Sequence, residues 1–240
     1  LPVAKLAVKK NCALFIEKPL GSSINGLSKL LEIIKSKNIP TYVAYNLRFH
    51  PIIDYIKRIT ENNKLVYIRA TCSSYLPLWR PDQDYKKSYS ASLDLGGGVV
   101  LELSHEIDYI YYLLGRIDKV SGQFSQLTDI TVDSEDYAEI IIESDNTPRA
   151  SVHINYASHY KERKIIADFE GFTLNCDLIS NSINKYSKEE LIEKKEFDIH
   201  QNYTYEKQLD YFFKYNSPTM MNNIFEATSL FKKIIDFKEN

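Results

Sequence analysis

Three polar residues recur at every third position of a predicted helix, and their types suit proton transfer. The apolar residues of segment 99–114 follow helical spacing and form one stripe: Val100, Leu103, Ile107, Ile110 and Leu114. Glu102, His105 and Asp108 are predicted on the opposite side of that helix. Acids one turn before and after a histidine can fix its tautomer and tune its basicity, and an imidazole with an unperturbed pKa of about 6.5 suits proton transfer near neutral pH. The same spacing also fits an exposed polar face with an ion pair.

Two predicted strands end beside charged side chains. The apolar run 13–18 and the β-rich run 41–45 flank a helix that the serine pair at 22–23 can cap. Strand, helix and strand with short joins form a βαβ unit, so we expect the two strands to be parallel. Ligands bind at the carboxyl ends of strands in open parallel sheets. Lys18 follows the first strand and Arg48 the second, and each fits either a functional cation or a solvated surface side chain.

The glycines allow one kind of anion site and exclude another. Gly96, Gly97 and Gly98 precede the helix at 99–114, and exposed amides in such a turn favour an anion, although a flexible loop would have the same composition. None of the eight glycines can build G-x-G-x-x-G between a strand and a helix, so the dinucleotide fingerprint is absent from this sequence. Among the other histidines, His50 and His200 have no acid or cysteine partners at ligand spacing, and we predict no metal site.

The composition is that of an ordinary globular protein. Its 240 residues carry 30 Lys and Arg against 32 Asp and Glu, and the net charge of −2 gives no electrostatic footprint for nucleic acid or an anionic membrane. No apolar run is long enough to span a bilayer. Three cysteines, far apart and odd in number, favour a reducing compartment over a disulfide framework. We therefore expect a cytoplasmic protein that binds neither nucleic acid nor membrane.

The pattern changes near residue 46. Two parallel strands cannot cover both of their faces alone, so we interpret residues 1–46 as the remnant of a larger Rossmann-type dinucleotide-binding domain whose beginning lies outside this sequence. Residues 47–240 contain consecutive strands joined by turns, which predicts an α+β domain with a largely antiparallel open sheet and helices on one face. We expect the uncovered face to be apolar and to pair with a second copy, giving a homo-oligomer.

Four motifs follow one another along the chain. They are LFIEKPLGSS (14–23), VAYNLRFHP (43–51), YLPLWRPDQDYKKSYSASLDLGGG (75–98) and VVLELSHEIDYIYYLLG (99–115). In this order they resemble the Gfo/Idh/MocA (glucose–fructose oxidoreductase/inositol dehydrogenase) family, and the resemblance runs through the whole chain. It implies a nucleotide-binding domain followed by a domain whose open sheet supports substrate binding and dimerisation. It also implies oxidation or reduction of a sugar-like or cyclitol carbon with NAD or NADP.

The resemblance implies roles for particular residues. Lys18 would contact the nicotinamide ribose and the substrate hydroxyl, His105 would accept the hydroxyl proton, and Asp108 would orient His105. The cofactor would lie against residues at the two strand ends: Glu17, Lys18, Pro19 and Asn46. The substrate would contact residues from several segments: Arg48, Trp79, Arg80, Tyr89 and Glu102. Many family members carry an acid four residues before the histidine, where this chain has Leu101.

The combined prediction is the C-terminal portion of an NAD(P)-dependent oxidoreductase that acts on a hydroxyl of a sugar, nucleotide-sugar or cyclitol. We expect the isolated chain to bind neither NAD nor NADP tightly and to be inactive, because the Gly-rich half is missing. That half would precede this sequence or be a separately encoded partner. The alternative is a non-catalytic dimerisation or sugar-binding module derived from such an enzyme.

Overall fold

The computed structural model describes residues 2–239 and separates them into two compact units. The first unit comprises the described residues up to Phe49 together with those from Gln201 onward, and the second unit is His50–His200. The predicted boundary places 47–240 in one domain, whereas the structure groups the last forty positions with the first fifty. The helical periodicity of those last positions predicts helices but does not say which unit they pack against.

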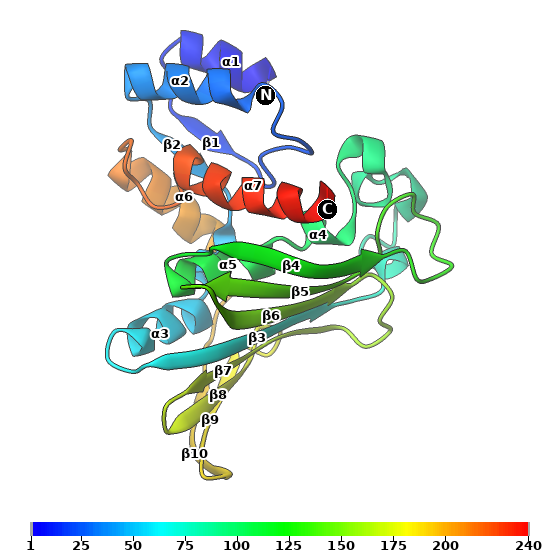
Figure 1. Cartoon of the computed structure of the whole chain (residues 1–240), viewed down its shortest axis with the longest axis vertical. Helices are drawn as coiled ribbons and strands as arrows, with labels where there is room; N and C mark the ends of the chain where they lie inside the picture. The colour runs from blue at the N-terminus through cyan, green and yellow to red at the C-terminus, as the bar shows by residue number, and fades with distance from the viewer. Residues whose placement is uncertain (1, 240) are drawn as a thin grey trace. The chain divides into compact units, whose positions relative to one another are not determined.

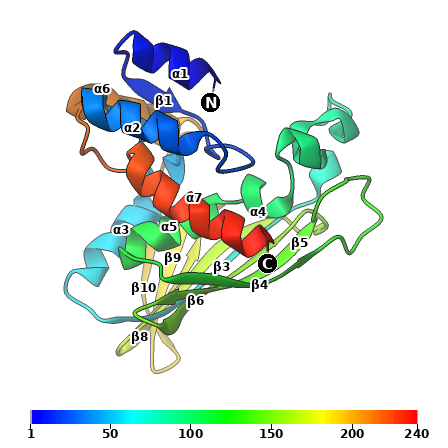
Figure 2. The same ribbon diagram turned by 45° about the horizontal axis from the view of Figure 1, so that its top comes forward.

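The first unit contains a small parallel sheet with helices. Its elements, in chain order, are α1 (Pro2–Lys9), β1 (Leu14–Ile16), α2 (Leu27–Lys37), β2 (Thr41–Val43), the 3₁₀ turn η1 (Asn46–Phe49), α6 (Tyr203–Tyr215) and α7 (Ile224–Glu239). Strands β1 and β2 pair in parallel, which confirms the βαβ prediction. The helix starts later than predicted, after Gly26, because Ser23 Oγ accepts a bond from the nearby Asn25 amide (3.4 Å) and does not cap it. Figure 2 shows α1 close to α2 and β1.

The C-terminal part of the chain covers one edge of β2. The Val43 amide donates to the Asn222 carbonyl (3.0 Å), and Asn222 Nδ2 donates back to the Val43 carbonyl (2.7 Å). The Ile224 amide donates to Thr41 Oγ1 (3.0 Å). Because β1 occupies the other edge of β2, the sheet is open to further strands only at β1 within residues 2–239.

The second unit is built on one eight-stranded sheet with the order β10-β9-β8-β7-β3-β6-β5-β4 (Figure 1). Its strands are β3 (Leu65–Ser73), β4 (Lys119–Ser125), β5 (Tyr137–Ser144), β6 (Thr147–Asn155), β7 (Glu162–Phe169), β8 (Phe172–Asp177), β9 (Ser182–Ser187) and β10 (Glu190–Glu196). Only the β3–β6 pair is parallel, and every other pair is antiparallel. Its helices are α3 (Pro51–Thr60), α4 (Val99–Glu102) and α5 (His105–Leu114). The predicted fold class, a parallel piece followed by an open antiparallel sheet, is confirmed; the hairpin β9–β10 was not predicted.

The two faces of the large sheet differ in chemistry. One row across it is buried and apolar, and helices α4 and α5 contact this side: Ile140, Val152, Ala70, Ile165, Cys176 and Ile183. The neighbouring row on the other face is polar throughout: Gln123, Glu139, His153, Thr71, Lys164, Asp177 and Ser182. There, His153 Nδ1 lies 2.6 Å from Glu139 Oε1. The expectation of an apolar open face is not met along this row, and the next row of the same face is mixed, with Ile141, Ser151, Arg69 and Ile166.

The segment between β3 and α4 consists of short 3₁₀ turns, at Leu76–Leu78, Tyr85–Lys87, Tyr89–Ala91 and Leu93–Leu95. This agrees with the irregular stretch that its Trp, Tyr and Pro content predicts. Across residues 2–239, no helix combines the length and apolar composition that crossing a membrane requires.

Candidate active site

His105 begins a helix instead of lying in the middle of one. The predicted helix 99–114 is interrupted at Leu103 (φ −95°, ψ 27°), so that α4 ends at Glu102 and α5 starts at His105. His105 is partly exposed, with its Nδ1 shielded from solvent. Asp108 is buried, which disagrees with the alternative interpretation of Glu102, His105 and Asp108 as an exposed polar face. The interruption thus separates the three residues into one at the end of α4 and two in the first turn of α5.

Four predicted substrate-binding residues lie together in the second unit. Tyr89 donates its hydroxyl proton to Glu102 Oε1 (3.0 Å), and the guanidinium of Arg80 lies over the Tyr89 ring, 5.4 Å from its centroid. Burial, with the adjacent Glu102 carboxylate, raises the pKa of Tyr89 above its ordinary value. Trp79 packs edge-on against Tyr156 with 5.3 Å between ring centroids. Trp79 and Arg80 also line one small hollow.

Tyr156 joins this group although the sequence gave no reason to select it. Its ring is fully buried, and its hydroxyl has no hydrogen-bond partner among the described residues. Burial raises its pKa well above the ordinary value, and the carboxylates of Glu102 and Glu135 add to this rise. A tyrosine at the end of a strand is common, so only the fold brings it beside Glu102. The aromatic and acidic side chains form a site edge suited to sugar hydroxyls and ring faces.

The glycine turn before α4 already holds an anion from its own chain. The carboxylate of Glu135 accepts a bond from the Val100 amide (3.3 Å), and its carbonyl accepts from the Val99 amide (3.0 Å). A Cβ on Gly98 (φ +105°) would lie 2.4 Å from Glu135 Oε1, and one on Gly97 would lie 2.4 Å from the Tyr89 carbonyl. The turn therefore needs glycine for close packing, and an internal carboxylate fills the predicted anion position.

The predicted strand-end residues belong to the first unit, where Asn46 and Arg48 bond other side chains of that unit. Lys18 and Pro19 follow β1 and are partly buried, while Glu17 is exposed. Asn46 donates from Nδ2 to Thr204 Oγ1 (2.7 Å). The Lys18–Pro19 peptide bond is cis.

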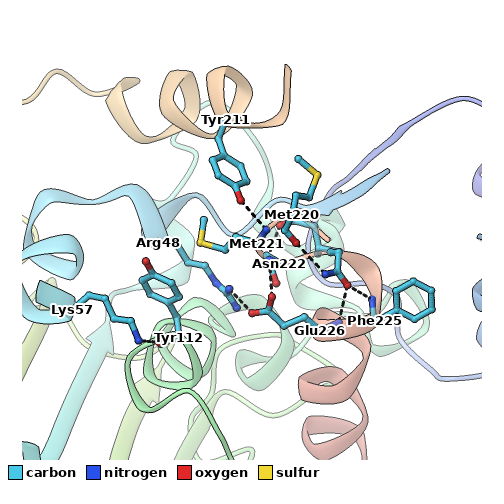
Figure 3. A network of polar contacts seen from close by, with 11 residues as sticks. Arg48, Lys57, Tyr112, Tyr211, Met220, Met221, Asn222, Phe225 and Glu226 are labelled. Atoms are coloured by element: carbon cyan, nitrogen blue, oxygen red, sulfur yellow. Dashed lines mark hydrogen bonds and ion pairs between the residues drawn. The ribbon is translucent and has the colours of Figure 1, made fainter. Parts of the chain in front are cut away.

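Arg48 is held by a carboxylate of the C-terminal helix. Its side chain is 0% exposed and lies 2.6 Å from Glu226 Oε1, while Glu226 is 27% exposed. Figure 3 shows Glu226 also accepting the Asn222 amide (2.7 Å). Because Lys18, Asn46 and Arg48 lie in one unit and His105 in the other, their convergence on one cleft stays a prediction.

A protein-family model described as the GFO/IDH/MocA C-terminal domain matches residues 53–174, about half of the chain. This chain belongs to the Gfo/Idh/MocA family. The matched range includes Trp79–Tyr89, the glycine turn and His105, but not Lys18 or Asn46.

The relatives of this family member are oxidoreductases. Levoglucosan dehydrogenase of Pseudarthrobacter phenanthrenivorans is 26% identical over 125 residues, which is 51% of this chain and 32% of that protein. A solved levoglucosan dehydrogenase in complex with NADH has a TM-score of 0.85 at 17% identity, and UDP-N-acetylglucosamine 3-dehydrogenase GnnA from Acidithiobacillus ferrooxidans has 0.79 at 15% identity. Both structural matches cover 99% of this chain and 73% of the other. The sequence match thus spans about a third of the curated relative.

Proposed function

We propose that this chain supplies the substrate-binding sheet domain and the proton-transferring histidine of an oxidoreductase that acts on a sugar, nucleotide-sugar or cyclitol hydroxyl. The observation that carries the proposal is the placement of His105 at the start of α5. It follows Glu102, the acceptor of the Tyr89 hydroxyl bond, by three residues. The family membership and the sugar dehydrogenases among the relatives support the same reaction class.

In this proposal each residue has a limited task. His105 takes the proton from the substrate hydroxyl during oxidation and returns it during reduction, while the buried Asp108 orients the imidazole. Lys18 polarises the same hydroxyl from the strand end, while the buried Arg48 supports the end of the second strand through its pair with Glu226 and does not line the cleft. Trp79, Arg80, Tyr89 and Glu102 bind the ring and hydroxyls of the substrate. NAD or NADP, when bound, accepts or supplies the hydride.

The residues present fit only part of such a cofactor. Glu17, Lys18, Pro19 and Asn46 lie at the carboxyl ends of the parallel strands, where a nicotinamide half would bind. No G-x-G-x-x-G cradle for the diphosphate occurs in the 240 residues. The open edge of β1 and the exposed Val3 and Leu6 of α1 leave room for further parallel strands. We propose that a segment outside this sequence supplies them, in the same polypeptide or in another.

We predict that the 240-residue chain alone does not bind NADH or NADPH at micromolar concentrations. The reason is that a diphosphate needs the free amides of a glycine-rich turn at a helix start, and the glycine turn before α4 is already filled by the Glu135 carboxylate. Isothermal titration calorimetry measures it directly. Adding a strand–G-x-G-x-x-G–helix segment is expected to restore binding and hydride transfer. Stoichiometric tight binding to the chain alone would contradict the prediction.

The missing fingerprint also favours one alternative, a non-catalytic sugar-binding or dimerisation module. The two candidates differ in whether the completed protein, once it binds NADH, also transfers hydride. If the completed protein binds NADH but transfers no hydride to or from any sugar tested, the module is the better description. If it turns over a sugar, the enzyme is.

We propose further that the open sheet face pairs with a second copy of the chain. Since this face is polar, with ion pairs such as Arg69–Asp168 at 3.0 Å, pairing would rest on hydrogen bonds and charges and weaken with salt. Light scattering at tens of micromolar is expected to give a dimer or larger at low salt and a smaller mass at high salt. A strictly monomeric mass at every concentration would count against it.

A further inference from the structure

A partly buried ion pair involves Glu106, the residue that follows His105. Glu106, the next residue of α5, is 0% exposed, and Arg163 of β7 is 26% exposed. Two hydrogen bonds join them, from Arg163 Nε to Glu106 Oε1 (2.7 Å) and from an Nη to Oε2 (3.2 Å). Burial alone would lower the pKa of Arg163, but Glu106 raises it above its ordinary value. Such a two-pronged pair fixes the plane of both groups.

The charges of the pair contribute to the pKa shifts of other titratable groups around it. Cys72 of β3 is the register partner of Arg163, and burial, with Glu106 adding to the effect, raises the pKa of its thiol to about 12. Burial and Glu106 also raise the pKa of Tyr109, one turn along α5. His50, which caps α3, has a pKa lowered to about 4 by burial, and Arg163 adds to that lowering. The pair therefore acts in a poorly solvated layer between α5 and the sheet.

The position of the pair constrains how α5 begins. Because the helix is interrupted at Leu103, the first turn of α5 does not inherit its rotation from α4. Successive helical residues point about 100° apart. A Glu106 side chain held toward β7 therefore sets the rotation of that turn and, with it, the direction of the His105 ring.

We propose that Glu106 and Arg163 form a positioning pair that fixes the direction of His105. The proposal rests on the proposed function for the role of His105, and it assigns Glu106 no contact with substrate or cofactor. The fork-shaped contact supplies the rigidity, and the two opposite charges balance each other. Neither residue was selected from the sequence, where Glu106 and Arg163 lie far apart.

Three variants of the 240-residue chain separate geometry from charge: Arg163→Lys, Arg163→Met and Glu106→Gln. Hydrogen exchange of the Asp108 amide, which bonds the Ser104 carbonyl (2.9 Å), reports the first turn of α5. We expect exchange about tenfold faster or more in all three, since lysine keeps the charge but cannot form the fork. NMR follows the His105 titration: its midpoint is expected to fall in Glu106→Gln, rise in Arg163→Met and stay in place in Arg163→Lys.

Two results would overturn the proposal. The first is hydrogen exchange of the Asp108 amide that is as slow in Arg163→Lys as in the original chain. The second is a His105 titration midpoint that moves in the same direction in Glu106→Gln and Arg163→Met, because loosening of the helix turn alone would cause that. Glu143→Gln is the matched control, because its pair with the exposed Lys119 (4.0 Å) lies elsewhere on the sheet. Neither measurement requires turnover, so an inactive His105 would defeat the proposed function without deciding this result.

Discussion

Replacing Glu226 with alanine is expected to lower the free energy of unfolding of the first unit by about 3 kcal/mol. The Arg48 side chain is fully buried, and removal of the carboxylate 2.6 Å away would take a counter-charge from it in a poorly solvated site. We expect a loss at the lower end of the range for broken buried ion pairs, because the Glu226 side chain is 27% exposed. Urea unfolding followed by circular dichroism measures it.

Two companion variants separate the charge from the other bond of Glu226. Glu226→Gln keeps an acceptor for the Asn222 amide and should lose less stability than the alanine variant. Asp54→Ala breaks the exposed pair with Arg58 (2.8 Å) and should cost less than about 0.5 kcal/mol. If Glu226→Ala costs no more than Asp54→Ala, the buried pair does not hold the two chain ends together.

Replacing His105 with asparagine is expected to lower kcat/KM for the sugar substrate by about 10²–10⁴-fold. Asparagine keeps hydrogen-bonding capacity but cannot take up a proton near neutral pH, so the fall reports proton transfer. The measurement uses this chain together with the nucleotide-binding segment that completes it. The acid limb of the pH–rate profile should also disappear, because that limb reports protonation of the base.

A second histidine serves as the control for this substitution. His153 lies on β6 beside Glu139 on the polar face of the sheet, and the proposal gives it no part in the chemistry. His153→Asn should keep kcat/KM within a few-fold of the original. Equal losses in the two variants, or an unchanged acid limb in His105→Asn, would remove His105 from the role of base.

Local patterns predicted most of the secondary structure, and their failures have physical causes. The runs at 13–18 and 41–45 form the parallel pair, and the consecutive strands predicted after residue 46 form the large open sheet. The hairpin at β9–β10 was missed because its strands are rich in Lys, Glu and Asn and mostly solvent-facing, which hides the usual alternation. Periodicity also could not reveal that helix 99–114 is interrupted, since the apolar stripe continues across Leu103.

Residue types and the family resemblance predicted which residues belong to the candidate site, but not the residues that hold them in place. Trp79, Arg80, Tyr89 and Glu102 lie near one another, and their contact with a substrate stays a prediction. Glu135 could not be selected, because its link to the glycine turn joins residues far apart in sequence. Long-range pairs of this kind depend on strand order and register, which no local pattern encodes.

The construction of the first unit from both ends of the chain has a consequence for biosynthesis. Domains tend to fold as units while the polypeptide emerges from the ribosome, amino end first. His50–His200 is continuous and can mature as soon as it has been translated. The edge of β2, however, waits for Asn222 and Ile224, which are made about 180 residues later. The nascent βα segment therefore stays unfinished, and open to chaperones or a partner, until those residues have emerged.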